Sequence, residues 1–399
     1  MGRITLTGRG RRRVLGGHPW IYKDDIAAGE GDRGELLPVE APDGSTLGWG
    51  LFSTASKIAV RLVTREKEQP KREFWLGRVR RAVEARRALG LDEERGACRL
   101  IGGDADGLPG FVVDRYADTL VVQSGCQGSD RMRDFLLTLC DEVRGVEAAR
   151  VYDRSDARVR KLEDLEPRAE WVRGAASGPI EVEEPTPGGP ALRFEVDVVE
   201  GHKTGHYLDQ RDNRVRAAAY AACKDGARVL DAFSYDGLFG IRAALAGARD
   251  VLCLDQSGPA GERVLRNAER NGVADRVRFE KVNAMHDLKR RATEGERYEL
   301  VIVDPPAFAR NRREAEGAGR GYRELNLRAL GLLRDGGYLV TCSCSFNVKP
   351  ADFAGFVADA SRDAGVPAWL VETAGAAPDH PALVTLPESS YLKCLVLRT

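Results

Sequence analysis

The sequence predicts an α/β protein whose largest part is a doubly wound, mostly parallel sheet. From Arg228 onward, short apolar β-type runs alternate with stretches of helical periodicity, which is the pattern of a parallel sheet covered by helices. Residues 1–72 instead carry Gly, Pro and short β-type runs. The chain has 399 residues, and ordinary domains have roughly 100 to 200. We therefore expect a small β-rich part and a small α/β part before the large sheet.

Local patterns define the first two parts. An all-β module over residues 1–72 is predicted from the runs Glu35–Val39, Leu47–Phe52 and Ile58–Leu62. An α/β part over residues 73–190 is predicted from the helical stretches Glu73–Leu89 and Asp130–Val143 and the β-type runs Phe111–Val113, Leu120–Gln123 and Ala149–Tyr152. It ends at the Pro- and Gly-dense turn 185–190, which separates the β-type runs Pro179–Glu184 and Ala191–Val199.

The third part, residues 191–399, carries the alternating pattern. Its predicted strands are Val229–Asp231, Val251–Asp255, Val277–Glu280, Leu300–Asp304, Tyr338–Ser343 and Leu392–Leu397. Its predicted helices each end close to a glycine that can adopt the left-handed cap, and they are Leu238–Ala246, Ala260–Asn271 and Glu324–Leu333.

The composition favours a cytoplasmic protein. No apolar run approaches the roughly 20 residues of a membrane-spanning helix, and Met1–Lys23 lacks the apolar core of a secretory signal. Eight Cys form no C-x-x-C pair, so we expect reduced thiols. The net charge is zero, yet Met1–Lys23 holds six basic residues and no acid. Those residues would attract phosphates, unless they are only a solvated charge run.

Five polar side chains fall at or just after the ends of predicted strands: Asp231, Asp255, Asn283, Asp304 and Cys344. In doubly wound sheets, ligands bind beyond the carboxyl ends of the strands. The turn Asp231–Gly237, which includes Phe233 and Ser234, opens a helix whose first amides attract polar groups. Asp255 follows at the interval of a ribose-binding acid. An ordinary strand–helix turn is the alternative.

The chemistry of this turn favours S-adenosylmethionine over a dinucleotide as cofactor. A dinucleotide needs glycines that let the backbone approach two phosphates, and G-x-G-x-x-G is absent here. S-adenosylmethionine has no phosphate and requires partners for its ribose, adenine and amino-acid ends. We expect Asp231, Phe233, Ser234, Gly237, Asp255, Asn283 and Asp304 to bind it.

The segment from Asp304 to Phe308 predicts a rigid ledge that holds a flat base. Pro305 and Pro306 block a helix directly after the strand. Phe308 would then stack on the base, and Asp304 would accept a hydrogen bond from its exocyclic amine or hold a proton. A turn with a solvent-facing Asp is the alternative.

Cys344 is the candidate nucleophile. Cytosine C5 reacts poorly until a thiolate adds to C6, so a thiol beside a bound base predicts C5 methylation. Cys342, two residues earlier, is expected to be buried and structural, as most such Cys are. His202 and His206 are four residues apart, but Gly205 disfavours a helix between them and methyl transfer needs no metal, so no metal site is predicted.

With these residues in hand, the sequence closely resembles the class I large-subunit ribosomal RNA methyltransferases that form 5-methylcytosine in 23S RNA. Motifs along nearly the whole chain carry the resemblance: His18–Tyr22, Gly48–Phe52, Asp106–Phe111, Gly201–Arg211, Asp231–Gly237, Asp304–Pro306, Ser343–Ser345, Asp379–Pro381 and Tyr391–Lys393. The resemblance implies a PUA-like RNA-binding domain, a middle α/β domain and a Rossmann-like catalytic domain. It also implies that Cys344 is the nucleophile and that 23S ribosomal RNA or a large-subunit precursor is the partner.

The sequence departs from that family at the target site. Ala307 stands where the family usually has Lys, and Ser345 or its neighbour stands where Gly is frequent. Related RNA enzymes carry a second Cys after the Asp-Pro-Pro, so here one Cys would serve both attack and release. Arg310–Arg313 and Arg320 could supply positive charge over RNA instead.

Two other functions stay open. Cys344 could be structural in an exocyclic-amine or other-position RNA methyltransferase, or the chain could be a non-catalytic RNA-binding assembly factor. No membrane partner is expected, and a homodimer is compatible with the sequence.

Overall fold

The computed structural model describes residues 2–308 and 315–399. The chain divides into two compact units, each built from distant segments. Unit 1 comprises Met1–Val182, Val196–Leu208 and Pro378–Ser389, and unit 2 comprises Glu183–Glu195, Asp209–Ala377 and Ser390–Thr399. Within the described ranges, no helix combines the length and the apolar character needed to cross a membrane. The functional boundaries after residues 72 and 190 stay predictions.

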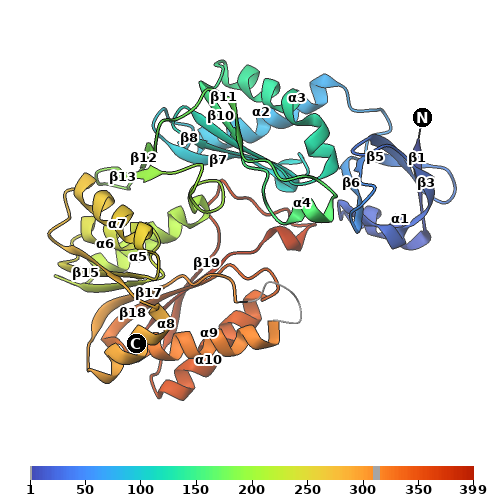
Figure 1. Ribbon diagram of the computed structural model, residues 1–399. Coiled ribbons are helices and arrows are strands. Elements are labelled where there is room, and N and C mark those ends of the chain that lie inside the picture. The colour runs from blue at the N-terminus through green and yellow to red at the C-terminus, as the bar shows by residue number, and fades with distance from the viewer. Residues whose placement is uncertain (1, 309–314) are drawn as a thin grey trace. The chain divides into compact units, whose positions relative to one another are not determined.

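A six-stranded sheet forms the N-terminal part of unit 1 (Figure 1, blue). Its order is β2-β6-β5-β4-β1-β3, where the strands are β1 (Arg3–Leu6), β2 (Trp20–Tyr22), β3 (Ile26–Glu30), β4 (Leu36–Glu40), β5 (Thr46–Phe52) and β6 (Ile58–Thr64). The pair β1/β4 is parallel and the others are antiparallel. The three predicted runs are therefore found as β4, β5 and β6.

The prediction that residues 1–72 are all β is wrong, because helix α1 (Gly8–Leu15) lies among these strands. The Thr7 hydroxyl caps it by accepting from the Gly10 amide at 3.1 Å. Arg9 and Arg13 both pair with the buried Asp25. Two of the six basic residues near the N-terminus are thus neutralised within the fold, which reduces the charge that could attract phosphates.

The central part of unit 1 is a five-stranded sheet of order β11-β10-β9-β8-β7. The strands are β7 (Ala97–Gly102), β8 (Phe111–Tyr116), β9 (Thr119–Ser124), β10 (Arg150–Asp153) and β11 (Glu170–Arg173), with helices α2 (Arg72–Ala88), α3 (Gln127–Arg144) and α4 (Val159–Leu162). Apolar side chains of α2, α3 and the sheet share one core. The strands β12 (Ile180–Glu184) and β13 (Leu192–Val196) pair with each other.

Unit 2 contains a seven-stranded sheet of order β16-β15-β14-β17-β18-β20-β19. The strands are β14 (Arg228–Ala232), β15 (Asp250–Asp255), β16 (Val277–Lys281), β17 (Tyr298–Val303), β18 (Leu333–Ser343), β19 (Trp369–Ala374) and β20 (Lys393–Arg398). β14 to β18 are parallel, whereas β20 runs antiparallel to both β18 and β19. The predicted α/β class with a doubly wound, mostly parallel sheet is confirmed.

Helices cover this sheet on both faces. They are α5 (Arg211–Ala222), α6 (Leu238–Leu245), α7 (Gly258–Arg270), α8 (Ala284–Thr293), α9 (Ala315–Leu330) and α10 (Pro350–Ala364). α5, α6 and α7 pack in succession, as do α8, α9 and α10 (Figure 1). Alternate residues of a strand face opposite sides. Leu230 and Ala232 of β14 therefore join the core under α9 and α10, whereas Asp231 turns towards α6.

The helix predictions for unit 2 were partly right. α6 and α7 are found where they were expected, but α9 begins at Ala315 rather than Glu324 and ends at Leu330. The glycines at 317, 319 and 321 disfavour a helix by propensity, and packing against the sheet and α10 overrides that preference. No bounds were predicted for α5, α8 and α10, although α10 has Pro350 in its first turn and the left-handed Gly365 at its end.

Candidate active site

One edge of the unit 2 sheet gathers the five strand-end residues. The neighbouring parallel strands β16, β15, β14, β17 and β18 are followed or ended by Asn283, Asp255, Asp231, Asp304 and Cys344 respectively. Since parallel strands place their carboxyl ends at the same edge, all five side chains lie along it, as predicted. The gathering of these residues at one edge follows from the topology of the sheet.

The turn after β14 is tightly built. Phe233 and Tyr235 have φ angles of 64° and 51°, which non-glycine residues seldom adopt. The Ser234 amide donates to the Leu254 carbonyl at 3.0 Å, which holds the turn against β15. Gly237 has φ 78°, and a Cβ there would lie 2.9 Å from Val264. A side chain at position 237 would therefore displace α7 or the turn.

Asp231 is completely buried beneath that turn. Its Oδ2 accepts from the Gly240 amide of α6 at 3.0 Å. Burial raises the pKa of Asp231 to about 8, and the negative charges of Asp304, Asp236 and Asp255 act in the same direction. The carboxyl group is thus largely protonated at neutral pH and supports the first turn of α6.

Asp255 ties the next two segments together. Its Oδ2 accepts from the Tyr235 amide at 3.1 Å, and its Oδ1 accepts from the Ser257 amide at 2.9 Å. The side chain is half-buried, so it also borders solvent. Asn283 is exposed and caps α8, since its Oδ1 accepts from the His286 amide at 3.2 Å. Asp255 and Asn283 therefore hold the loops that follow β14, β15 and β16 in place.

Asp304 is oriented by a residue that the sequence analysis did not single out. Gln210, directly before α5, donates from Nε2 to Asp304 Oδ2 at 2.9 Å. Asn213 in turn donates to Gln210 Oε1 at 2.6 Å, which fixes the direction of the amide. Gln210 belongs to the motif Gly201–Arg211, so its only sequence signal was the family resemblance.

The ledge after β17 is present, and its parts differ in exposure. Pro305 is buried, Pro306 is exposed, and Ala307 and Phe308 are half-buried. The ring of Phe308 meets Tyr322 of α9 edge-to-face, with centroids 4.8 Å apart. Arg320 is exposed on α9, whereas Arg310–Arg313 lie outside the described residues.

Cys344 is half-buried at the end of β18, whereas Cys342 is completely buried and lies opposite Cys394 of β20. Burial and the Cys394 thiol raise the pKa of Cys342 well above its usual value, the thiol contact being the larger cause. The prediction that Cys342 is an interior side chain is confirmed. Tyr322, which was missed because its helix was expected to begin later, bonds through its hydroxyl to those of Ser343 and Ser345, at 2.8 Å each.

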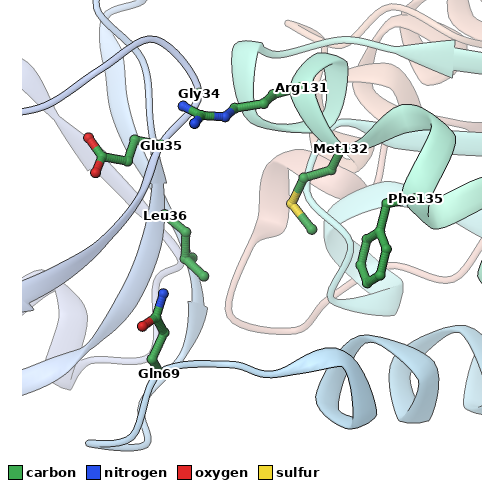
Figure 2. Close-up of a pocket in the computed structure, with 7 residues that line it drawn as sticks. All are labelled: Gly34, Glu35, Leu36, Gln69, Arg131, Met132 and Phe135. Atoms are coloured by element: carbon green, nitrogen blue, oxygen red, sulfur yellow. The ribbon is translucent and has the colours of Figure 1, made fainter.

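A shallow hollow of about 360 Å³ lies in unit 1, between β4 and α3 (Figure 2). Its lining contains none of the predicted site residues, and comprises Gly34, Glu35, Leu36, Gln69, Arg131, Met132 and Phe135. Its two charged groups are engaged locally, since Glu35 accepts from the Asp32 amide and Arg131 donates to the Arg33 carbonyl. Nothing in this lining indicates chemistry.

Across residues 2–308 and 315–399, no three His, Cys, Asp or Glu side chains gather as ligands of an ion would. His202 and His206 lie in a turn closed by a bond from the Gly205 amide to the His202 carbonyl, and not on a helix.

Comparisons with known proteins place these features in families. Residues 153–398 match the model of the S-adenosylmethionine-dependent methyltransferases, and residues 4–65 match that of a PUA-like domain. The ribosomal RNA large subunit methyltransferase I of Shewanella amazonensis is 40% identical, over 96% of this chain and 95% of that protein. The enzyme of the same name from Aeromonas salmonicida is 38% identical, over 98% of both chains.

Solved structures show the same fold. A methyltransferase structure complexed with SAH covers 100% of both chains with a TM-score of 0.85 and 19% identity. A SAM-dependent methyltransferase from Streptococcus mutans does the same with a TM-score of 0.83 and 18% identity. At this identity, the likeness concerns the arrangement of the chain and not the identity of a substrate.

Proposed function

Since this chain belongs to the S-adenosylmethionine-dependent methyltransferases, we propose that it methylates C5 of a cytosine in large-subunit ribosomal RNA. The names of its relatives, which match over nearly their full length, support ribosomal RNA as the substrate. The observation that carries the choice of C5 is the half-buried Cys344, which directly follows β18, while the Asp304 ledge directly follows the neighbouring strand β17. A thiol in that position can reach a base held on the ledge.

The residues of the cofactor edge fit S-adenosylmethionine. The turn from Asp231 to Gly237 offers the first amides of α6 to a carboxylate, and Asp255 borders solvent as a partner for ribose hydroxyls. The tight turn leaves no glycine-rich cradle for a pyrophosphate. We assign Phe233, Ser234 and Asn283 to the same binding surface, with Asp231 acting through the shape of the turn.

The remaining residues handle the base. The bound cofactor supplies an electrophilic methyl group. Asp304 accepts from the cytosine amine, while Pro305, Pro306 and Phe308 hold the ring. The Cys344 thiolate adds to C6 and so makes C5 nucleophilic. C5 then forms a bond to the methyl carbon, whose bond to the donor sulfur breaks. When C5 loses its proton, the bond between C6 and the Cys344 sulfur breaks and the thiolate is released.

The test is to identify the methylated nucleoside. Purified protein would be incubated with radiolabelled S-adenosylmethionine and unmodified 23S RNA or large subunits, and the RNA digested and analysed by chromatography and mass spectrometry. Label in 5-methylcytidine is expected. Label in a methylated guanosine or adenosine would overturn the C5 assignment, and absence of label on both substrates would favour an assembly factor.

RNA contacts outside the catalytic edge are part of the proposal. We assign residues 1–72 to RNA binding, residues 73–190 to a middle domain and residues 191–399 to catalysis. The PUA-like match over residues 4–65 supports the first assignment. Action on ribosomal RNA also implies that the protein works in the cytoplasm. Deletion of residues 1–72 should weaken RNA binding and leave cofactor binding unchanged.

We further propose a homodimer formed through strand β19. Among the residues that the structure describes, β19 is the last strand of its sheet and pairs with β20 alone. Three successive side chains there are exposed, with Trp369 at 62%, Leu370 at 54% and Val371 at 45%. Uncovered apolar edge strands favour pairing with another copy. Analytical ultracentrifugation should show a dimer that Leu370→Lys dissociates, and a monomeric wild-type protein would refute it.

A further inference from the structure

A buried lysine lies next to the proposed nucleophile. Lys393 begins β20 and pairs with Ser343 in the antiparallel ladder with β18. Its side chain is almost completely buried. Nζ donates to the carbonyls of Ser345 and Tyr391, each at 2.7 Å. The ammonium group therefore bonds to the residue that follows Cys344, and Lys393 lies opposite the residue that precedes Cys344.

The residues around Lys393 do not neutralise its charge in the way that is usual for a buried cation. Buried charges are normally paired with an opposite charge. Among the described residues, no carboxylate forms an ion pair with Lys393, and its two acceptors are neutral carbonyls. Burial lowers the pKa of Lys393 to about 8, and the charge of Cys344 acts in the opposite direction. The ionisable group that can balance the charge of Lys393 is thus the Cys344 thiol.

We propose that the Lys393 ammonium stabilises the thiolate of Cys344, which makes Lys393 a positioning residue for the nucleophile. This inference rests on the proposed function, in which Cys344 attacks C6. The Cys344 thiol releases its proton to solvent, while Lys393 stays protonated. The buried ammonium group and the thiolate then form an ion pair with no net charge. The hydrogen bond to the Ser345 carbonyl holds that cation next to the backbone of Cys344.

The other titratable groups nearby cannot supply this charge. Tyr322 of α9 contacts Ser343 and Ser345, and burial raises its pKa, so the phenol is neutral at physiological pH. Asp304, whose carboxylate raises the pKa of Cys342, would oppose a second negative charge. Cys342 and Cys394 lie within the sheet and bring no positive charge. The positive charge of Lys393 offsets the repulsion between the Asp304 carboxylate and the Cys344 thiolate.

The test measures the ionisation of Cys344 directly. The full-length protein would be alkylated with iodoacetamide over a range of pH, and the rate at each Cys read by peptide mass spectrometry. The exposed Cys223 serves as a reference thiol in the same chain. In the wild type, Cys344 should reach half its maximal rate at a lower pH than Cys223. Lys393→Met should raise that midpoint by at least about one pH unit.

Matched variants separate charge from structure. Lys349, exposed and five residues after Cys344, provides the control Lys349→Met, which should change neither midpoint. Lys393→Arg keeps the charge and should restore most of the lowered midpoint. A Cys344 midpoint equal to or above that of Cys223 in the wild type, or one unchanged in Lys393→Met, would overturn the inference. If Lys393→Met fails to fold, the wild-type comparison alone decides.

The same data distinguish this inference from the proposed function. If Cys344→Ala loses methyl transfer but Lys393→Met leaves the thiol midpoint unchanged, the nucleophile stands and the role of Lys393 is refuted. If the midpoint depends on Lys393 but Cys344→Ala still methylates RNA, the charge pair stands and the proposed nucleophile is refuted.

Discussion

The two halves of the catalytic edge are stabilised in different ways. On the cofactor side, after β14, β15 and β16, Asp231, Asp255 and Asn283 each accept from a backbone amide within ten residues. The Asp255 bond to Tyr235 and the contact of the Cys253 thiol with Asp231 are longer-range and join β14 to β15. On the target side, after β17 and β18, groups are held by residues far away in the sequence, such as Asp304 by Gln210 and the Ser345 carbonyl by Lys393. The cofactor side is therefore a locally encoded shape, and the target side is assembled by the tertiary fold.

This difference predicts distinct mutant phenotypes. Changes on the cofactor side should alter cofactor affinity or the stability of the turn. Changes on the target side should alter the chemical step and leave cofactor affinity nearly unchanged.

The largest effect is expected at Cys344. Cys344→Ala removes the proposed nucleophile, so methyl transfer should fall by at least about 10³-fold while cofactor affinity is retained. Single-turnover transfer and calorimetric titration of the cofactor measure the two quantities. Cys223→Ala, which removes an exposed thiol elsewhere, is the control. Near-normal turnover of Cys344→Ala would mean that the target side acts without a covalent step.

Asp231 gives the next largest effect, and it concerns stability. Its pKa of about 8 exceeds the usual carboxyl value of 3.8, so the folded state binds a proton that the unfolded state releases. Stability from this group is therefore present at low pH and is lost as pH rises towards 8. Between pH 5 and pH 8, wild-type unfolding free energy should fall by roughly 3 kcal/mol more than that of Asp231→Asn. Parallel pH profiles of the two proteins would contradict this.

The same local encoding explains what the sequence analysis could foresee. Asp231, Asp255, Asp304 and Cys344 could be located because each lies at or just after the end of a recognisable strand, and the topology of a parallel sheet then brings strand ends together. Most of the strands and the helices α6 and α7 were predictable for the same reason, since their periodicity lies within one short segment.

The rest depended on contacts that no local pattern contains. Gln210 acts on Asp304, 94 positions later, and Lys393 reaches the Ser345 carbonyl across 48 positions. Tyr322 lies in a stretch whose glycines disfavour the helix that packing imposes. The buried state of Asp231 also could not be foreseen, because it depends on α6 closing over the strand end.

Substitution of Asp255 should change cofactor affinity and leave the methyl-transfer step nearly unchanged. Asp255→Ala removes the proposed ribose partner and two bonds to backbone amides, so cofactor affinity should fall about twentyfold, which corresponds to about 2 kcal/mol. Transfer at saturating cofactor should stay within a few-fold of wild type. Asp250→Asn, at the opposite end of the same strand, should leave affinity unchanged. An equal loss in both variants would indicate general damage to β15 instead.

The smallest effect is expected at Gln210. Gln210→Met keeps the volume but removes the donor that orients Asp304, so the rate of transfer should fall about tenfold, the value of about one lost hydrogen bond to a charged group. Cofactor affinity should change much less, because the turn after β14 makes its bonds within itself and to β15. Gln69→Met, in the hollow of unit 1, is the matched control. If Gln210→Met weakened cofactor binding as strongly as the rate, Asp304 would belong to the cofactor side, and the boundary between the two halves would lie at β18 rather than at β17.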